Sequence, residues 1–233
     1  ITLLPASVSA DDTGSGVPYV DEFGNVLPCA VYTRITNSTT VWDGGWYVVD
    51  STTTISSRVS VSGSVRLILC DGITLTVKGG ISVNSGNSLL IYGQIGQTGK
   101  LAISGVANDN AGIGGDGGNS SGMITINGGI INSIGGYYGA GIGGGDHGTG
   151  SIIINGGDVT VTGGAQAAGI GGGTGGGGII TINGGIVNAS GGGVANWPSP
   201  PYFKFGAAIG AGGLNGNWTI VINGGDVTAN GSY

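Results

Sequence analysis

Charged side chains are scarce in this sequence. Only 8% of its 233 residues are Asp, Glu, Lys or Arg, against about 25% in an ordinary globular domain. Just six residues are basic, and the formal net charge is −6. Binding of nucleic acid needs a clustered basic surface, and attraction to anionic lipid needs basic residues near the membrane. The composition therefore predicts no nucleic-acid partner and no electrostatic attachment to a membrane.

Long hydrophobic runs are missing too, and no stretch of about 18 apolar residues predicts membrane insertion. The two cysteines, Cys29 and Cys70, can form one disulfide or remain two buried thiols, and the sequence leaves both alternatives open. With a single His, the chain lacks the Cys and His pattern of a zinc site. Because it starts at Ile1 rather than Met, we expect a mature or trimmed chain, and because no cap follows the last strand pattern, we expect further repeats or a flanking domain of a larger protein.

Helical periodicity is absent, and no long run of Ala, Leu, Glu or Lys occurs. Collagen is excluded because only six residues are Pro and the glycines keep no three-residue period. What the chain does have is 56 glycines and 39% hydrophobic residues, the latter in short runs rich in Ile, Val and Thr. Such runs are typical of β-strands, so we predict an all-β fold with tight turns rather than disorder.

An internal repeat organises most of the chain. The block Ile-x-Ile-Asn-Gly-Gly occurs four times, with its Asn at Asn127, Asn155, Asn183 and Asn223, so the spacings are 28, 28 and 40 residues. A second block, Ala-Gly-Ile-Gly-Gly, spans 111–115, 140–144 and 168–172, and it recurs loosely at 207–210. A third short run follows each Asn-Gly-Gly. Two independent markers with matching spacings indicate a true repeat.

Each repeat therefore holds three short strands separated by Gly-rich turns. Three strands that close one coil and stack on the next form a right-handed parallel β-helix, and the sequence predicts about six coils. The repeated asparagines should stack in one column and hydrogen-bond as a ladder along the axis. Degraded copies of the Ile-rich block extend the pattern backward, and they predict that Cys70 and Tyr92 occupy the same column.

The non-repeating N-terminal part predicts a separate structural role. We assign residues 1–45 to an N-terminal cap with a hairpin over residues 19–26, and residues 46–233 to the β-helix. Trp42 and Trp46, at the junction, are expected to belong to the cap. Such a cap is needed because a solenoid end exposes both its core and its unpaired strand edges.

The run from 45–49 (Gly-Trp-Tyr-Val-Val) through 67–72 (Leu-Ile-Leu-Cys-Asp-Gly) and 90–94 (Leu-Ile-Tyr-Gly-Gln) leads to Gly-Lys-Leu at 99–101 and the Ala-Gly-Ile-Gly-Gly blocks. This pattern resembles a family of large secreted or surface proteins of gut bacteria, mostly Firmicutes, in Gly-rich repeat β-solenoid modules. The resemblance implies an extracellular module, of a kind often labelled carbohydrate-binding. It implies no catalytic residues.

A catalytic or metal site has one candidate location. Asp116 and Asp146 each follow an Ala-Gly-Ile-Gly-Gly block, so they should lie on neighbouring coils at the same corner, with His147 and Asp109 nearby. Paired carboxylates can hydrolyse a glycosidic bond, and carboxylates can bind Ca²⁺. Asp is also a common turn residue, and no Arg or Lys lies close in sequence. We therefore favour no catalytic residue, and calcium is the only cofactor we consider, with Asp116 and Asp146 as its ligands.

A ligand-binding site is the better-supported hypothesis. The last repeat is longer than the others, and its extra residues lie within 194–205, a segment rich in aromatic residues and Pro. Insertions in solenoids map to loops that often belong to the binding face. Aromatic rings on a stiff loop can stack on sugar rings, although such a loop can instead cover the solenoid flank or contact another subunit. The expected ligand-binding residues are Trp197, Tyr202, Phe203 and Phe205 in the insertion, with Tyr137 and Tyr138 in the corresponding turn two coils earlier.

These patterns favour a non-catalytic, adhesin-like extracellular module that binds carbohydrate or a host-surface component. One alternative is a polysaccharide-degrading enzyme, a glycoside hydrolase or lyase, that uses Asp116 and Asp146. The other is a passive stalk whose stiffness is its function. Fold class alone does not decide among the three.

Overall fold

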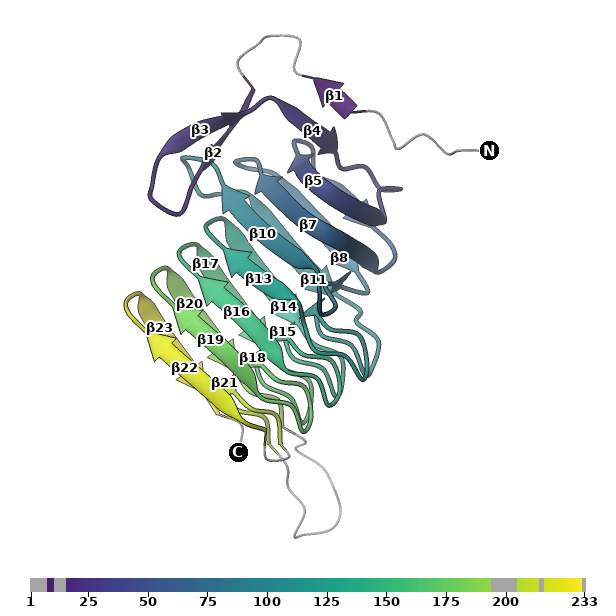
Figure 1. The fold of residues 1–233 in the computed structure, drawn as a ribbon, viewed down its shortest axis with the longest axis vertical. Helices are drawn as coiled ribbons and strands as arrows, with labels where there is room; N and C mark the ends of the chain where they lie inside the picture. The colour runs from purple at the N-terminus through teal and green to yellow at the C-terminus, as the bar shows by residue number, and fades with distance from the viewer. Residues whose placement is uncertain (1–7, 11–15, 194–204, 214–215, 232–233) are drawn as a thin grey trace.

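The coiled body of the protein consists of β-strands that wind around one axis (Figure 1). The structure, a computed structural model, describes residues 8–10, 16–193, 205–213 and 216–231. Within these residues all regular elements are strands, and no helix is long and apolar enough to cross a membrane. The all-β prediction is confirmed.

The strands of the coils lie on three faces. The first face holds β5 (Val41–Val49), β7 (Val59–Leu69), β10 (Ser88–Gly93), β13 (Met123–Ile126), β16 (Gly150–Ile154), β19 (Gly178–Ile182) and β22 (Trp218–Ile222). The second face holds β6 (Thr53–Ile55), β8 (Thr74–Lys78), β11 (Lys100–Ser104), β14 (Ile130–Ile134), β17 (Asp158–Thr162), β20 (Ile186–Ser190) and β23 (Asp226–Asn230). The third face holds β9 (Ile81–Ser82), β12 (Ile113–Gly114), β15 (Ile142–Gly143), β18 (Ile170–Gly171) and β21 (Ile209–Gly210).

Neighbouring coils pair in parallel on every face. On the first face Ile124, Ile152, Ile180 and Ile220 align with one another, which is the register that the repeat block predicts. The long strand β7 turns a corner, since its start pairs with β9 and its end pairs with β10. From β7 to β23 the described residues form six coils, so the predicted parallel β-helix with three strands per coil is confirmed.

The core forms because side chains alternate along each strand. In β13, β16 and β19 the two Ile residues of each Ile-x-Ile block point inward and are buried, while the residue between them is half-buried on the outside. The asparagines that follow these blocks form the predicted ladder. Nδ2 of Asn155 donates to Oδ1 of Asn127 at 2.7 Å, and Asn183 and Asn223 continue the same bond at 2.8 Å each.

The backward extension of the Asn column is right at one position and wrong at the other. Ile91 pairs with Ile126, so Tyr92 precedes Asn127 in the column. Tyr92 pairs with Ile68 on the preceding coil, whereas Cys70 lies two residues further along and outside the column. The Leu-Ile-Leu-Cys motif misled the prediction because a two-residue shift keeps Leu67 and Leu69 pointing inward, so alternation alone does not fix this register.

The N-terminal region covers one end and part of the first face. β2 (Val17–Val20) and β3 (Val26–Cys29) form an antiparallel hairpin where one was expected, while β4 (Val31–Arg34) pairs with both β1 (Val8–Ala10) and β5. The predicted boundary at residue 45 falls inside β5, which already pairs in parallel with β7 and places Trp42 in the solenoid core.

The hairpin packs on the outward side of β5, β7 and β10. Cys29 joins Val48, Ile68 and Tyr92 in an apolar cluster there, and Cys70 packs against its margin. Both cysteines are free thiols. Burial raises the pKa of Cys29, and burial together with nearby carboxylates raises the pKa of Cys70 to about 11, so both thiols are protonated at neutral pH.

Candidate functional site

The turns before and after β12, β15 and β18 are hydrogen-bonded from coil to coil and form what we call the loop ridge. It is defined as residues 107–110, 116–120, 135–139, 144–148, 163–167 and 172–176. The Thr174 amide donates to the Tyr138 carbonyl at 2.9 Å, and the Asp146 amide donates to the Asp109 carbonyl at 2.7 Å. These bonds link the turn before one strand to the turn after the strand of a neighbouring coil. The ridge covers the third-face glycines, which are buried.

Glycine is required on these strands for two reasons. Gly143 has a φ of +136°, a conformation that side-chain-bearing residues rarely adopt. A Cβ at this position would also collide with the carbonyl oxygen of Gly171 on the next coil. Gly114 and Gly171 repeat the same conformation and the same close approach. The Ala-Gly-Ile-Gly-Gly motif therefore specifies a place where two backbones stack without side chains between them.

Tyr137 and Tyr138 lie on one turn of the ridge. Their ring centroids are 4.7 Å apart in an edge-to-face arrangement, with an interplanar angle of 77°. Both side chains are half-buried, so each ring keeps an accessible part. The backbone of the turn is held by a bond from the Tyr138 amide to the Asn108 carbonyl at 2.7 Å. The two rings thus form an accessible aromatic pair on a turn whose backbone is fixed by a hydrogen bond.

The aromatic insertion emerges from the equivalent turn. One hydrogen bond closes this turn in three successive coils: Gly139 to Gly136, Ala167 to Gly164, and Gly206 to Gly192. The insertion therefore leaves and rejoins the coil at the turn equivalent to that of Tyr137 and Tyr138, two coils later, as the repeat spacing predicts. Trp197, Tyr202 and Phe203 lie outside the described residues, and Phe205 at the end of the insertion is half-buried.

Asp116 lies in an internal network of the solenoid. Its Oδ1 accepts from Nε of Arg58 at 2.7 Å, and its Oδ2 accepts from Oγ of Ser82 and Nδ2 of Asn84, both at 2.8 Å. Burial alone would raise the pKa of this carboxyl. The hydrogen bonds from Asn84 and Ser82 and the charge of Arg58 outweigh burial and hold the pKa below its ordinary value. Asp116 is therefore ionised, and both of its carboxylate oxygens accept hydrogen bonds from within the protein.

Arg58 is the residue that sequence reasoning missed at this corner. Its Nη1 donates to the carbonyls of Gly79 at 2.7 Å and Ala111 at 2.9 Å, so the side chain joins three coils. Burial lowers its pKa, and Asp116 partly compensates. Arg58 and Asp116 are 58 positions apart. The only signal in the sequence was a lone basic residue just before a strand, which does not indicate its partner.

Asp146 and His147 lie on the next coil with different partners. Oδ2 of Asp146 is 3.0 Å from Nδ1 of His147, while its Oδ1 is buried without a hydrogen-bond partner among the described residues. His147 has a φ of +58° and is exposed. Asp109 contributes its backbone carbonyl, not its carboxylate, to Asp146. The Asp116 backbone stacks on Gly145, so Asp116 and Asp146 lie on neighbouring coils as expected. Their carboxylates have different partners, because Asp116 binds Arg58 and Asp146 contacts His147.

This arrangement lacks the features of a hydrolytic pair. A general acid needs a raised pKa, whereas that of Asp116 is lowered and both of its oxygens are occupied. In the described part of the chain, no group of three or more His, Cys, Asp or Glu side chains is close enough to hold a metal ion. The geometry therefore favours a structural role for Asp116 in tying coils together.

Comparison with known proteins agrees with the fold. Residues 124–146, 180–213 and 220–233 match a family model described as beta helix repeat. Each matched segment starts at the first Ile of an Ile-x-Ile-Asn-Gly-Gly block. No curated protein and no solved structure matches the chain. The chain thus carries β-helix repeats, a module shared by adhesins, carbohydrate-active enzymes and stalks, and the module does not choose among these functions.

Proposed function

We propose that this chain is a non-catalytic extracellular module that binds carbohydrate or another host-surface component through its loop ridge. The observation that carries the proposal is the position of the Tyr137–Tyr138 pair. These accessible rings lie on the turn whose equivalent, two coils later, carries the aromatic insertion. The two ends of the insertion, Gly192 and Gly206, thus lie at the turn equivalent to that of the tyrosine pair, and loops on a rigid scaffold are the usual place for binding residues.

The chemistry of the ridge suits a sugar ligand. Tyrosine combines an apolar ring with a hydroxyl, so it can contact both the apolar face and the hydroxyl groups of a sugar. A turn that is already ordered pays little conformational entropy when a ligand binds. The low charge of the chain argues for neutral rather than strongly acidic ligands.

The competing functions have less support. The occupied oxygens and lowered pKa of Asp116 disfavour an enzyme at that corner. A passive stalk has no need of accessible aromatic pairs or of an aromatic insertion at the same turn. We place the module at the cell surface or in a secreted chain with flanking domains, and we treat calcium as a variable to be tested at Asp146.

A glycan-array screen tests the proposal. The purified 233-residue chain is applied with calcium and with EDTA, alongside the variants Tyr137→Ala/Tyr138→Ala and Trp197→Ala/Tyr202→Ala. Phe23→Ala is the matched control, because Phe23 is 82% exposed but lies in the turn of the β2–β3 hairpin. We expect selective glycan binding that both double variants weaken at least tenfold and the control leaves unchanged.

The opposite results are equally clear. If the folded wild-type chain binds no glycan, the carbohydrate version of the proposal fails. If it binds but neither double variant changes the signal, the ridge is not the site. Loss of binding in EDTA would add a cation to the site and bring in Asp146.

A further inference from the structure

The outer side of the second face carries charges of opposite sign on the two sides of its middle strand, β14. Lys78 and Lys100 lie on β8 and β11, whereas Asp158 and Asp226 lie on β17 and β23. None of the four forms an ion pair with the part of the chain that the structure describes. In a chain with so few charges, this separation about one strand indicates a surface for an oppositely charged partner.

Exposed isoleucines lie among these charges. The outward residues of β14 are Ile130, Asn132 and Ile134, and Ile134 is 56% exposed. Ile186 on β20 is 50% exposed. Ile is among the residue types that are most often buried, so the second face leaves apolar side chains and unpaired charges together on one surface.

The strand register places these side chains symmetrically about β14. Lys100, Ile130 and Asp158 lie side by side on three successive coils. Because neighbouring strands are about 4.8 Å apart, Lys100 and Asp158 lie at equal distances on either side of Ile130. A twofold rotation about an axis that runs parallel to β14, above its outer side, therefore brings each Lys100 opposite an Asp158.

We infer that the second face binds a second copy of the chain about this axis, with the two solenoid axes antiparallel. Lys100 of one protomer faces Asp158 of its partner, which gives two ion pairs. Between these pairs, Ile130 and Ile134 each face the same residue of the other protomer. Such self-complementarity is what a twofold interface requires.

Charge selects this arrangement over its neighbours. An axis along β17 would place Asp158 opposite its own copy, and an axis along β11 would do the same for Lys100. Like charges that face each other destabilise an interface. If the solenoid axes were parallel instead, Lys100 would face Ser104 at the other end of β11, and no ion pair would form.

The size of the surface sets the expected affinity. Its seven strands span about 34 Å at a spacing of about 4.8 Å, and five residues along a strand span about 16 Å. Covering this area on both protomers buries roughly 1,100 Å², near the lower limit for a specific interface. We therefore expect a weak dimer with a Kd of about 10–100 µM, and a monomer at about 1 µM.

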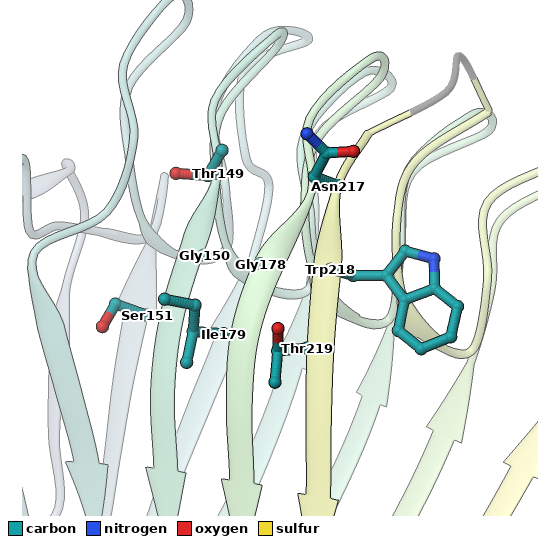
Figure 2. Close-up of a pocket in the computed structure, with 8 residues that line it drawn as sticks. All are labelled: Thr149, Gly150, Ser151, Gly178, Ile179, Asn217, Trp218 and Thr219. Atoms are coloured by element: carbon teal, nitrogen blue, oxygen red, sulfur yellow. The ribbon is translucent and has the colours of Figure 1, made fainter.

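The first face offers no comparable match. Ile179 is 65% exposed there, in a row with the uncharged residues Ser151 and Thr219 (Figure 2). Trp218 extends on the side of β22 away from Ile179, so the indole and the row do not form one apolar surface (Figure 2). This row specifies no register for a second copy, and it supplies a control for the test.

The dimer also determines where the loop ridges lie. The rotation keeps the strand direction, so the turns that follow β14 and carry Tyr137 and Tyr138 emerge along the same edge of both protomers. Two ridges on one edge increase the avidity for a multivalent surface without any new contact. This consequence rests on the proposed function, whereas the dimer itself does not.

Sedimentation velocity of the purified 233-residue chain, from about 1 to about 500 µM, tests the inference. The variants Lys100→Glu and Asp158→Lys each reverse one charge, and Lys100→Glu/Asp158→Lys exchanges both. We expect the wild type to dimerise and each single reversal to weaken the dimer at least tenfold. The double reversal should restore the affinity to within about threefold of the wild type, because it re-forms the pairs with opposite polarity.

Ile134→Glu places two carboxylates together at the twofold axis and should also weaken the dimer at least tenfold. Its matched control is Ile179→Glu, which changes a similarly exposed Ile on the first face and should leave dimerisation unchanged. Asp43→Lys, at an exposed position on β5, is the control for charge reversal. Thermal unfolding at about 1 µM, where the chain is monomeric, confirms that each variant folds.

Four results would overturn the inference. They are a monomer over the whole concentration range, a dimer that neither single reversal weakens, a double reversal that fails to restore the dimer, and equal effects of Ile134→Glu and Ile179→Glu. Glycan-array binding at about 1 µM is independent of dimerisation, so failure of the dimer and failure of the proposed function are distinguishable.

Discussion

Single residues in this protein act mainly by joining one coil to the next. Arg58 and Asp116 are the clearest example, because they pair across coils in a partly buried corner while Arg58 also donates to backbone carbonyls and Asp116 also accepts from Ser82 and Asn84. The lowered pKa of Asp116 means that this network is most stable with the carboxylate ionised. The same residue that suggested catalysis in the sequence therefore serves to hold the solenoid together.

Replacing Asp116 tests this role. Asp116→Asn leaves Arg58 partly buried without its counter-charge, and we expect a loss of about 1–2 kcal/mol in the free energy of unfolding, between the values for exposed and buried pairs. Denaturant unfolding at pH 7 measures it. Asp158→Asn, at an exposed position on β17, is the control and should change stability little.

The pH dependence of stability gives the second arm of this test. Because the folded-state pKa of Asp116 lies below its unfolded value, the stabilisation is complete above about pH 5 and is lost as the pH falls through the folded-state pKa. Wild type should therefore lose its advantage over Asp116→Asn on acidification. An unchanged difference between pH 7 and pH 3 would contradict this account.

Neighbouring strands are held in register by the Asn ladder on the first face and by the Gly-containing strands of the third face. Each rung of the ladder links two first-face strands at the same corner, and each third-face strand stacks backbone on backbone. Both devices depend on residues that recur once per coil, so a change in one coil disturbs only its neighbours, as in other solenoids.

The middle rung of the ladder should matter more than its end. Asn155→Ala removes a bond to Asn127 and a bond from Asn183, and we expect a loss of about 1–3 kcal/mol, because the partner amides lose their hydrogen bonds. Asn223→Ala removes one bond at an exposed position and should cost less. Thermal unfolding of both variants compares them, and equal costs would show that the ladder does not act through its internal rungs.

The third-face glycines should tolerate no side chain. Gly143→Ala combines a φ of +136° with a collision against Gly171, and we expect a loss of several kcal/mol, about 3 or more, or failure to fold. Gly231→Ala is the control because nothing lies within 4 Å of its Cβ position. Expression yield and thermal unfolding distinguish them, and a stable Gly143→Ala protein would mean that coil stacking is looser than the structure indicates.

The whole molecule differs from one end to the other. At the N-terminal end, β1, β4 and the β2–β3 hairpin cover the strand edge and part of the first face (Figure 1). In the last described coil the pattern of burial changes, since Ile222, aligned with the buried Ile182, is 53% exposed. Trp218, on the same coil, is 59% exposed.

Hydrogen exchange should reveal this gradient. In the isolated 233-residue chain, the amides of β22 and β23 should exchange well before those of β16 and β17, because fewer buried contacts protect the last coil. Mass spectrometry of peptic peptides measures the order. Uniform protection across all coils would contradict a weaker end.

Much of the fold could be predicted from the sequence, because every coil needs the same residue types at the same positions and they therefore repeat along the chain. The Ile-x-Ile-Asn-Gly-Gly and Ala-Gly-Ile-Gly-Gly blocks predicted the three-strand coil, the register and the Asn ladder. The prediction failed for Cys70, because in an apolar run without Gly-Gly a shift of two residues leaves the same side chains pointing inward, so alternation does not fix the register. It also placed Trp42 in the cap, although Trp42 fills the core of the first coil.

The candidate sites show where sequence alone stops. Repeat spacing predicted that the insertion starts and ends at the turn equivalent to that of Tyr137 and Tyr138, and the bond from Gly206 to Gly192 agrees. Repeat spacing could not pair Asp116 with Arg58, nor reveal that Ile134 stays exposed, because burial and exposure of apolar residues depend on what packs against them. The sequence by itself determined the coil, its period and its stacking column, because each depends on local backbone geometry and alternation. The tertiary structure decided which carboxylate is neutralised and which apolar surface stays open, because both depend on neighbours that are distant in the chain.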